Sequence, residues 1–132
     1  MNAHLFVYGS LMSAARHPMG ERLAREARLI GEASMRGRLY RVSTYPGLVG
    51  GDAHARVHGE VYALNAPAVS LKWLDAYEGI VPGDRERSQY ERAERQVLLA
   101  SGEEIAAWVY LYLRDVARLR AIPHGRWMAD PG

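Results

Sequence analysis

The sequence predicts an α+β domain whose β-sheet is curved or closed. Segments with the pattern of β-strands outnumber those with the pattern of helices, and the last two strands follow one another as a hairpin. Strands joined in this way pair antiparallel, so at least part of the sheet is antiparallel. A length of 132 residues leaves room for one domain, residues 1–132, with a sizeable hydrophobic core.

The chain begins with a strand and a helix. The strand is expected over residues 4–8, which are rich in β-favoured residues, and it stops at Gly9, a residue that can adopt positive φ. The helix follows over residues 20–29, and Gly31 marks its end or the turn into the next strand. That next strand is expected over residues 35–42.

A turn and a loop separate this strand from a third one. Residues 44–47 predict the turn, because Pro46 fixes φ and Gly47 can adopt a type II conformation. Residues 50–52 predict a mobile loop. The clearest strand of the chain covers residues 56–64, where small and β-branched side chains alternate with larger ones.

A second helix is expected after this strand. Asn65 supplies its N-cap, Pro67 is tolerated in its first turn, and Gly79 is the C′ residue that ends it. Its apolar stripe comprises Val69, Trp73, Leu74 and Tyr77.

The C-terminal part contains the hairpin. Residues 80–88 predict a loop, and residues 90–99 and 105–113 predict two strands that turn near Ser101-Gly102. The tail that follows is expected to be irregular and to be held by Trp127.

Composition narrows the classes of function. The chain is 48% hydrophobic and 24% charged, as in an ordinary globular protein. No apolar stretch is long enough to cross a bilayer and no secretory signal is apparent, so we expect a cytoplasmic protein with no membrane partner. Cysteine is absent, which excludes disulfides and cysteine nucleophiles. A net charge of only +2 with scattered arginines argues against a nucleic-acid partner.

The sequence also lacks the patterns of common cofactor and metal sites. His54 and His58 are four residues apart, but they lie where a loop enters a strand, and there this spacing does not put both on one face. No His-Glu-x-x-His helix, phosphate loop or dinucleotide fingerprint is present. We therefore expect no metal and no cofactor.

Glu78 is the first candidate for chemistry. It falls in the last turn of the second helix, where the negative end of the macrodipole disfavours an ionised carboxylate. Near a pocket, this position and burial among Tyr77 and Trp73 would raise its pKa and suit it to proton transfer near neutral pH. The pattern alone favours the alternative, a solvated glutamate, because isolated glutamates are rarely catalytic.

The loop Tyr8-Gly9-Ser10-Leu11 is the second candidate. Its backbone N–H groups could bind an oxyanion or a substrate carboxylate, whereas the alternative is a β-turn with a buried tyrosine. Ser10 could be a nucleophile, but its surroundings are not G-x-S-x-G and no base for it is identifiable.

Three further tyrosines complete the set of candidates. Tyr45, in the expected turn, belongs either to a pocket rim or to a bare turn. Tyr90, in a Tyr-x-Arg pattern with Arg92, could shape a pocket wall or only pair strands. Tyr110 and Tyr112 lie on one face of their strand, which could line a cavity or pack in the core.

Eight short motifs in one order resemble the γ-glutamylcyclotransferase-like family, which includes the AIG2-like proteins and the γ-glutamylamine cyclotransferases. The motifs are Phe6-Val7-Tyr8-Gly9-Ser10-Leu11, Gly37-Arg38-Leu39-Tyr40, Tyr45-Pro46-Gly47-Leu48, Val57-His58-Gly59-Glu60-Val61-Tyr62, Leu74-Asp75-Ala76-Tyr77-Glu78-Gly79, Tyr90-Glu91-Arg92, Ala107-Trp108-Val109-Tyr110 and Ile122-Pro123-His124-Gly125-Arg126-Trp127. They extend through nearly the whole chain.

The resemblance implies a small mixed, largely antiparallel β-barrel with peripheral helices and a cavity at one mouth. It implies an enzyme that cyclises a small-molecule γ-glutamyl substrate to 5-oxoproline without a cofactor, with Glu78 as acid/base and the loop after the first strand as binding loop. The alternative is a barrel of the same fold that binds a small ligand without turning it over. Arg126 departs from the family, where this position is often acidic, which leaves any contact made by the tail open.

Overall fold

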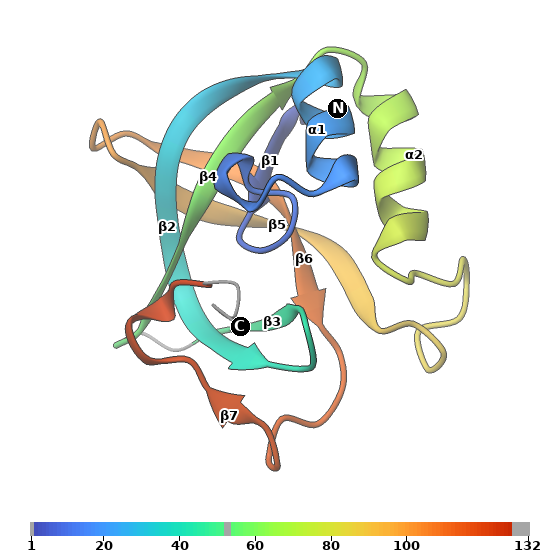
Figure 1. The fold of residues 1–132 in the computed structure, drawn as a ribbon, viewed down its shortest axis with the longest axis vertical. Helices are drawn as coiled ribbons and strands as arrows, with labels where there is room; N and C mark the ends of the chain where they lie inside the picture. Colours follow the sequence, from blue (N-terminus) through green and yellow to red (C-terminus); the bar gives the residue numbers. More distant parts are fainter. Residues whose placement is uncertain (1, 52–53, 128–132) are drawn as a thin grey trace.

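The computed structural model describes residues 2–51 and 54–127, which form a β-barrel with two helices beside it (Figure 1). The strands are β1 His4–Val7, β2 Ala27–Arg41, β3 Pro46–Gly50, β4 Arg56–Leu64, β5 Tyr90–Leu99, β6 Glu104–Tyr112 and β7 Arg120–Ala121. The helices are α1 Pro18–Glu26 and α2 Pro67–Tyr77, with short 3-10 turns at Ser13–Ala15 and Pro123–Gly125.

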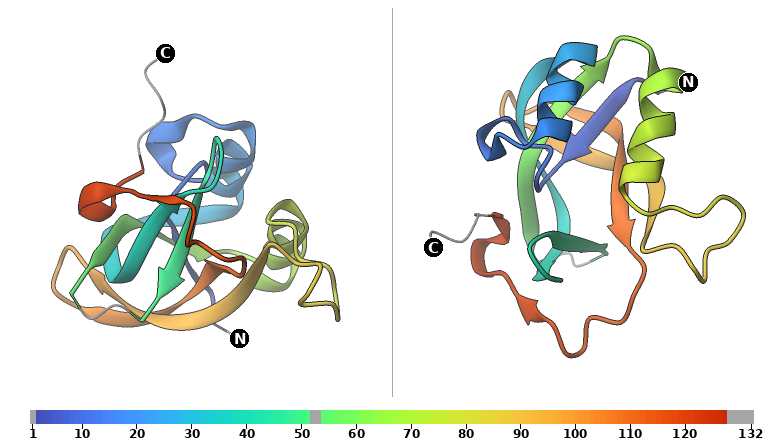
Figure 2. Two further views of the ribbon diagram at one scale, coloured as in Figure 1. Left: turned by 90° about the horizontal axis from the view of Figure 1, so that it is seen from below. Right: turned by 45° about the vertical axis from the view of Figure 1, so that its right-hand side comes forward.

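Five strands close into the barrel in the order β2-β4-β1-β6-β5, and a pairing of β5 with the middle of β2 completes the circle. Every pairing is antiparallel except that of β1 with β6, which makes the barrel mixed. The far end of β2 also pairs with β3 and β7. The predicted fold class is thereby confirmed (Figure 2).

The boundary between the first helix and the next strand differs from the prediction. α1 ends at Glu26, and Ala27 already pairs with Leu64 of β4. Gly31 is not a turn but lies at a β-bulge within β2, where the register with β4 shifts and φ is +150°. Pairing with the long partner strand outweighs the local helical pattern of residues 27–29.

The expected turn at residues 44–47 is shifted, and β3 was missed. The bend occupies residues 43–45, and Pro46 begins β3. Gly47 has no positive φ, so the type II interpretation is wrong. Its glycine is required by packing instead, because a Cβ there would lie 2.8 Å from Cγ of Tyr112. Gly50 ends β3, Gly51 has a φ of +95°, and the rest of the expected loop, residue 52, lies outside the described residues.

The second helix is confirmed with two corrections. Its N-cap is Ala66 rather than Asn65, and no side chain caps it. Its buried residues are Ser70, Leu71 and Leu74, whereas Val69 is 63% exposed and does not belong to the buried face.

Strand β4 and the C-terminal hairpin follow the prediction closely. β4 and β5 have the expected bounds, and the hairpin turns through Gly102, whose φ is +94°. The tail is less irregular than expected, because it contains β7 and a 3-10 turn. Trp127 packs against the barrel core and under the Arg41 guanidinium, whose carbon lies 4.5 Å from the ring centroid.

Two apolar clusters stabilise the molecule. One fills the barrel, around Phe6, Met35 and Val109, and the other lies between the barrel and the two helices. Glu26 joins α1 to α2, because its carboxylate accepts hydrogen bonds from Ser70 Oγ at 2.6 Å and Trp73 Nε1 at 2.9 Å. These bonds lower the pKa of Glu26 to about 2. Within the described part of the chain, no helix is long and apolar enough to cross a membrane.

Candidate active site

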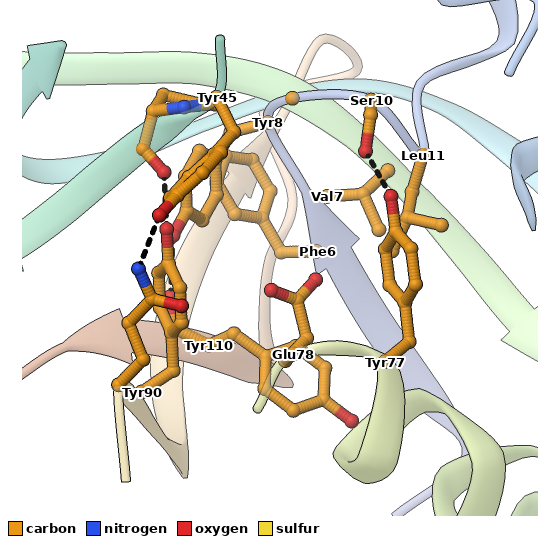
Figure 3. Close-up of a pocket in the computed structure, with 13 residues that line it drawn as sticks. Phe6, Val7, Tyr8, Ser10, Leu11, Tyr45, Tyr77, Glu78, Tyr90 and Tyr110 are labelled. Atoms are coloured by element: carbon orange, nitrogen blue, oxygen red, sulfur yellow. Dashed lines mark hydrogen bonds between the residues drawn. The ribbon is translucent and has the colours of Figure 1, made fainter. Parts of the chain in front are cut away.

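A cavity of about 210 Å³ opens where the loop after β1 meets the C-terminal end of α2 (Figure 3). All eight predicted site residues line it: Tyr8, Gly9, Ser10, Leu11, Tyr45, Glu78, Tyr90 and Tyr110. The other lining residues are Phe6, Val7, Pro46, Tyr77 and Gln89. Segments 80 or more residues apart in the chain therefore meet here because the barrel is closed.

The loop after β1 lies at the edge of this cavity. Its turn is held by a hydrogen bond from the Met12 N–H to the Gly9 carbonyl at 3.0 Å. Among the described residues, no acceptor bonds to the N–H groups of Gly9, Ser10 or Leu11. Three consecutive N–H groups with no internal partner at the edge of a pocket can bind an anionic oxygen.

Position 9 requires glycine for a different reason from the one predicted. Its φ is not positive, but a Cβ at this position would lie 2.9 Å from Cγ of Pro46 in β3. The loop and β3 thus approach too closely for any side chain at Gly9. Strand β3 was missing from the predicted secondary structure, so this contact could not be anticipated.

Ser10 is engaged with α2. Its Oγ and the Tyr77 hydroxyl are hydrogen bonded at 2.7 Å, which ties the loop to the turn of helix that precedes Glu78. The Tyr77 ring in turn packs against the His17 ring, with centroids 5.8 Å apart. No hydrogen bond links Ser10 Oγ to a histidine or a carboxylate in the described chain, which is not the environment of an activated nucleophile.

Glu78 is the C-cap of α2. Its N–H donates to the Leu74 carbonyl at 2.9 Å, and Gly79 follows with a φ of +75°, as predicted for the C′ residue. The Glu78 carboxylate points into the pocket (Figure 3). Burial raises the pKa of Glu78 to about 7. Within the described residues it accepts no side-chain hydrogen bond, so both oxygens remain available to a ligand.

Tyrosine side chains form much of the wall of the pocket, and their hydroxyl groups are held by hydrogen bonds. Tyr8 donates to the Tyr110 carbonyl at 2.6 Å, and Tyr90 donates to the Pro46 carbonyl at 2.5 Å. Tyr45 accepts a hydrogen bond from Gln89 Nε2 at 2.5 Å. Burial raises the pKa of Tyr8, Tyr90 and Tyr110 above the usual range, so these phenols stay neutral and Glu78 is the group that titrates near pH 7.

Behind the wall, Asp75 links three elements. Its carboxylate accepts a hydrogen bond from the Tyr110 hydroxyl at 2.6 Å and two from Arg92, at 2.8 Å from Nε and 3.3 Å from a terminal nitrogen. The Arg92 guanidinium also stacks on Trp108, 4.4 Å from the ring centroid. Arg92 of the Tyr-x-Arg pattern therefore does not line the pocket but supports the strand and helix that do.

Sequence reasoning missed Gln89 and the roles of Tyr77 and Asp75. Tyr77 and Asp75 precede Glu78 in a helix by one and three residues, so helical spacing predicts their proximity but not their partners. Gln89 stands at the end of a loop, just before the Tyr90-Glu91-Arg92 motif, and nothing in the sequence pairs it with Tyr45. Only the closure of the barrel brings it to Tyr45.

A concave, largely aromatic pocket that holds one buried carboxylate, at one end of a closed barrel, is the kind of site in which proteins bind small molecules. The chain belongs to the γ-glutamyl cyclotransferase, AIG2-like family, whose sequence profile matches residues 5–129. The protein is therefore an enzyme of the cyclotransferase class.

One relative agrees with this assignment both in sequence and in structure. The chain is 35% identical over 127 residues to the gamma-glutamylcyclotransferase family protein YtfP of Escherichia coli K12, covering 94% of this chain and 95% of YtfP. The solution structure of E. coli ytfP superposes with a TM-score of 0.66 over 95% of this chain and 96% of that one.

More distant structures share the fold alone. YkqA from Bacillus subtilis has a TM-score of 0.70 at 24% identity, covering 96% of this chain but 40% of the longer YkqA chain. An AIG2-like protein from Mus musculus has a TM-score of 0.68 at 22% identity, with 98% and 97% of the two chains covered.

Proposed function

We propose that the protein cyclises a small γ-glutamyl compound to 5-oxoproline and releases an amine or peptide. The free α-amine of the γ-glutamyl group attacks its own γ-carbonyl carbon and forms the ring C–N bond. The bond from that carbon to the leaving nitrogen then breaks, and the proton lost by the attacking amine is transferred to the leaving nitrogen. No other reactant is consumed.

The observation that carries this proposal is the Glu78 carboxylate, which lies in the pocket with a pKa of about 7. A group with such a pKa is part ionised and part protonated near neutral pH, so it can accept the proton and return it. Since nucleophile and electrophile belong to one molecule, holding the folded-back conformer supplies much of the rate enhancement.

The loop after β1 would bind the negatively charged oxygens of the substrate. None of the thirteen described residues that line the pocket is Lys, Arg or His, so an anionic oxygen would be held there by neutral donors, among them the N–H groups of Gly9, Ser10 and Leu11. Such donors can hold the α-carboxylate of the substrate or stabilise the oxyanion that forms at the γ-carbon.

The size of the pocket suggests which part of the substrate it would hold. Its 210 Å³ is below the range of about 300–1,000 Å³ typical of pockets for drug-sized ligands. The γ-glutamyl group would fill it, and the leaving group would project past Tyr45 and Gln89 at the rim. These two side chains would then contact the leaving amine or peptide.

Mass-spectrometric detection of 5-oxoproline from a panel of γ-glutamyl amines and peptides tests the proposal. The wild type should release 5-oxoproline from at least one compound, and Glu78→Gln should nearly abolish this release because an amide cannot exchange the proton. Glu103→Gln, which changes an exposed glutamate in the hairpin turn, should be as active as the wild type.

The alternative, a barrel that binds without turnover, predicts a different result. The protein would then bind 5-oxoproline or a γ-glutamyl compound in a calorimetric titration, and no 5-oxoproline would form from any member of the panel. An active Glu78→Gln variant would remove Glu78 from the mechanism.

A further inference from the structure

A second cavity, of about 770 Å³, shares no residue with the pocket of Glu78. It lies between β2, the start of β4 and the C-terminal segment, which Figures 1 and 2 show in red. Its lining contains six arginine and histidine residues, and none of the described residues that line it is acidic. The six are Arg38, His54, Arg56, His58, His124 and Arg126. The whole chain has 17 Lys and Arg residues and 15 Asp and Glu residues, so the excess of basic side chains is a property of this cavity and not of the chain.

The C-terminal segment forms one wall of this cavity in a constrained position. The Ile122 N–H donates to the Leu39 carbonyl at 2.8 Å, which anchors the segment to β2. Gly125 is buried with a φ of +62°, and a Cβ there would overlap the carbonyl oxygen of Arg56. His124 also has a positive φ, of +67°. The close passage over β4 therefore sets where His124 and Arg126 stand relative to Arg56.

Two of the arginines that line the cavity, Arg56 and Arg126, lie near enough to His58 to influence its titration. The Arg56 guanidinium is oriented by its Nε–H, which donates to Ser34 Oγ at 3.0 Å. Partial burial and the charges of Arg126 and Arg56 lower the pKa of His58, against the opposing effect of Glu32. Within the described residues, neither Arg56 nor Arg126 forms an ion pair with a carboxylate.

We infer that this cavity binds a small molecule that carries phosphate groups. Guanidinium groups donate paired hydrogen bonds that fit phosphate oxygens, and several cations around one concavity match the charge of a phosphate better than that of a single carboxylate. The volume lies within the range of small-molecule sites, and a concave shape favours a compact ligand over a nucleic-acid strand. The inference does not depend on the reaction proposed for Glu78.

NMR titration of the ¹⁵N-labelled full chain with pyrophosphate, ATP and a single-stranded oligodeoxythymidylate tests this inference. Pyrophosphate or ATP should bind with saturation at one site, and the shifts should centre on residues 54–58 and 121–126. Arg56→Gln and Arg126→Gln should each weaken binding by about tenfold or more, the effect expected for loss of a hydrogen bond between charged groups. Arg28→Gln, which removes an exposed arginine of β2 outside this cavity, should leave the affinity unchanged.

A second readout follows His58 directly. A bound phosphate should raise the pKa of His58, which neighbouring Arg56 and Arg126 lower in the free protein, and the imidazole proton resonance of His58 reports this shift. The inference is overturned if none of the phosphate probes binds, or if His58 titrates identically with and without the ligand. It is also overturned if the oligonucleotide binds more tightly than ATP and Arg28→Gln weakens all probes equally, since that pattern indicates general charge attraction.

Discussion

At the C-cap of α2, the Glu78 carboxyl group titrates near pH 7 because the pocket excludes much of the water that would stabilise its charge. In the unfolded chain this group has a pKa of about 4.5. Since folding raises the pKa, the protonated form stabilises the native state. This contribution is complete below pH 4.5 and is lost as the pH rises through about 7.

We therefore expect Glu78→Gln to be more stable than the wild type at pH 8, by up to about 3 kcal/mol, and similar to it at pH 5. The neutral amide does not pay for burying a charge at high pH. Urea unfolding of both proteins at the two pH values measures the difference, and Glu103→Gln serves as the control on an exposed glutamate. A stability difference that does not change with pH would contradict the assigned burial.

Gly9 and Ser10 are adjacent but serve the loop in different ways. Gly9→Val should reduce kcat/KM by about a hundredfold, because a side chain there meets Pro46 and displaces the backbone donors. Ser10→Ala removes the hydrogen bond to Tyr77 but keeps the N–H groups, so we expect a loss of about tenfold or less.

Steady-state kinetics and circular dichroism of both variants measure this order of effects. If Gly9→Val does not fold, the smaller Gly9→Ala should fall between it and Ser10→Ala. Intact-mass spectra of the wild type during turnover should show no adduct on Ser10. An inactive Ser10→Ala protein together with such an adduct would support a serine nucleophile instead.

At the scale of elements, the C-terminal end of α2 is held to the barrel by Asp75. Its bonds to Tyr110 of β6 and Arg92 of β5 lie one helical turn before Glu78, so they orient the helix end that carries the carboxylate. Asp75 does not line the pocket itself.

We expect Asp75→Asn to lower kcat by about tenfold or more while KM changes little, because the substrate contacts remain but Glu78 is less well placed. Glu91 lies beside Arg92 on β5, and Glu91→Gln, which removes an exposed ion pair with Arg85 of the preceding loop, should leave both constants unchanged. Steady-state kinetics of both variants over a range of pH tests this role of Asp75. Misplacement of Glu78 should also shift the pH dependence of kcat, whereas a purely structural role of Asp75 should not. Equal effects of both variants would show that Asp75 has no specific role.

At the scale of the whole molecule, the barrel depends on the close pairing of β4 with the end of β1. A Cβ at Gly59 would overlap the Val7 carbonyl oxygen, so this position of β4 requires glycine. Val7 leads directly into the loop that lines the pocket. The stability of the barrel and the geometry of the site are therefore linked where β4 packs against the end of β1.

Gly59→Ala should destabilise the protein by about 3 kcal/mol or more, because backbone on both sides must move. Gly50→Ala is the matched control, since a Cβ at Gly50 has nothing within 4 Å and we expect its free energy of unfolding to change little. Urea unfolding measures both variants. Equal stability of Gly59→Ala and Gly50→Ala would show that the backbone of β1 and β4 can move apart without loss of stability.

Much of the architecture could be predicted because its signals are local. The bounds of β4 and β5, the turn at Gly102 and the role of Gly79 follow from alternation and from glycines with positive φ. The misplaced end of α1 and the missed β3 have one cause. Each depends on pairing with a distant strand, which overrides the preferences of a short window.

The candidate site divides in the same way. Its lining residues could be chosen from motifs in the sequence, and the family is shown by the match over residues 5–129. The reason why position 9 must be glycine could not be predicted, because Pro46 approaches it only when β3 pairs with β2. The same holds for Gln89, which reaches Tyr45 across the closed barrel.

The sequence by itself determined the α+β class, most strands, the C-terminal end of α2 and eight of the thirteen residues that line the pocket, since propensity, periodicity and motifs are properties of neighbouring residues. Tertiary structure alone decided the closure of β5 onto β2, the pKa of Glu78 and the cationic cavity around Arg56 and Arg126. These three depend on distances between groups far apart in the chain, and burial and charge act through such distances rather than through sequence order.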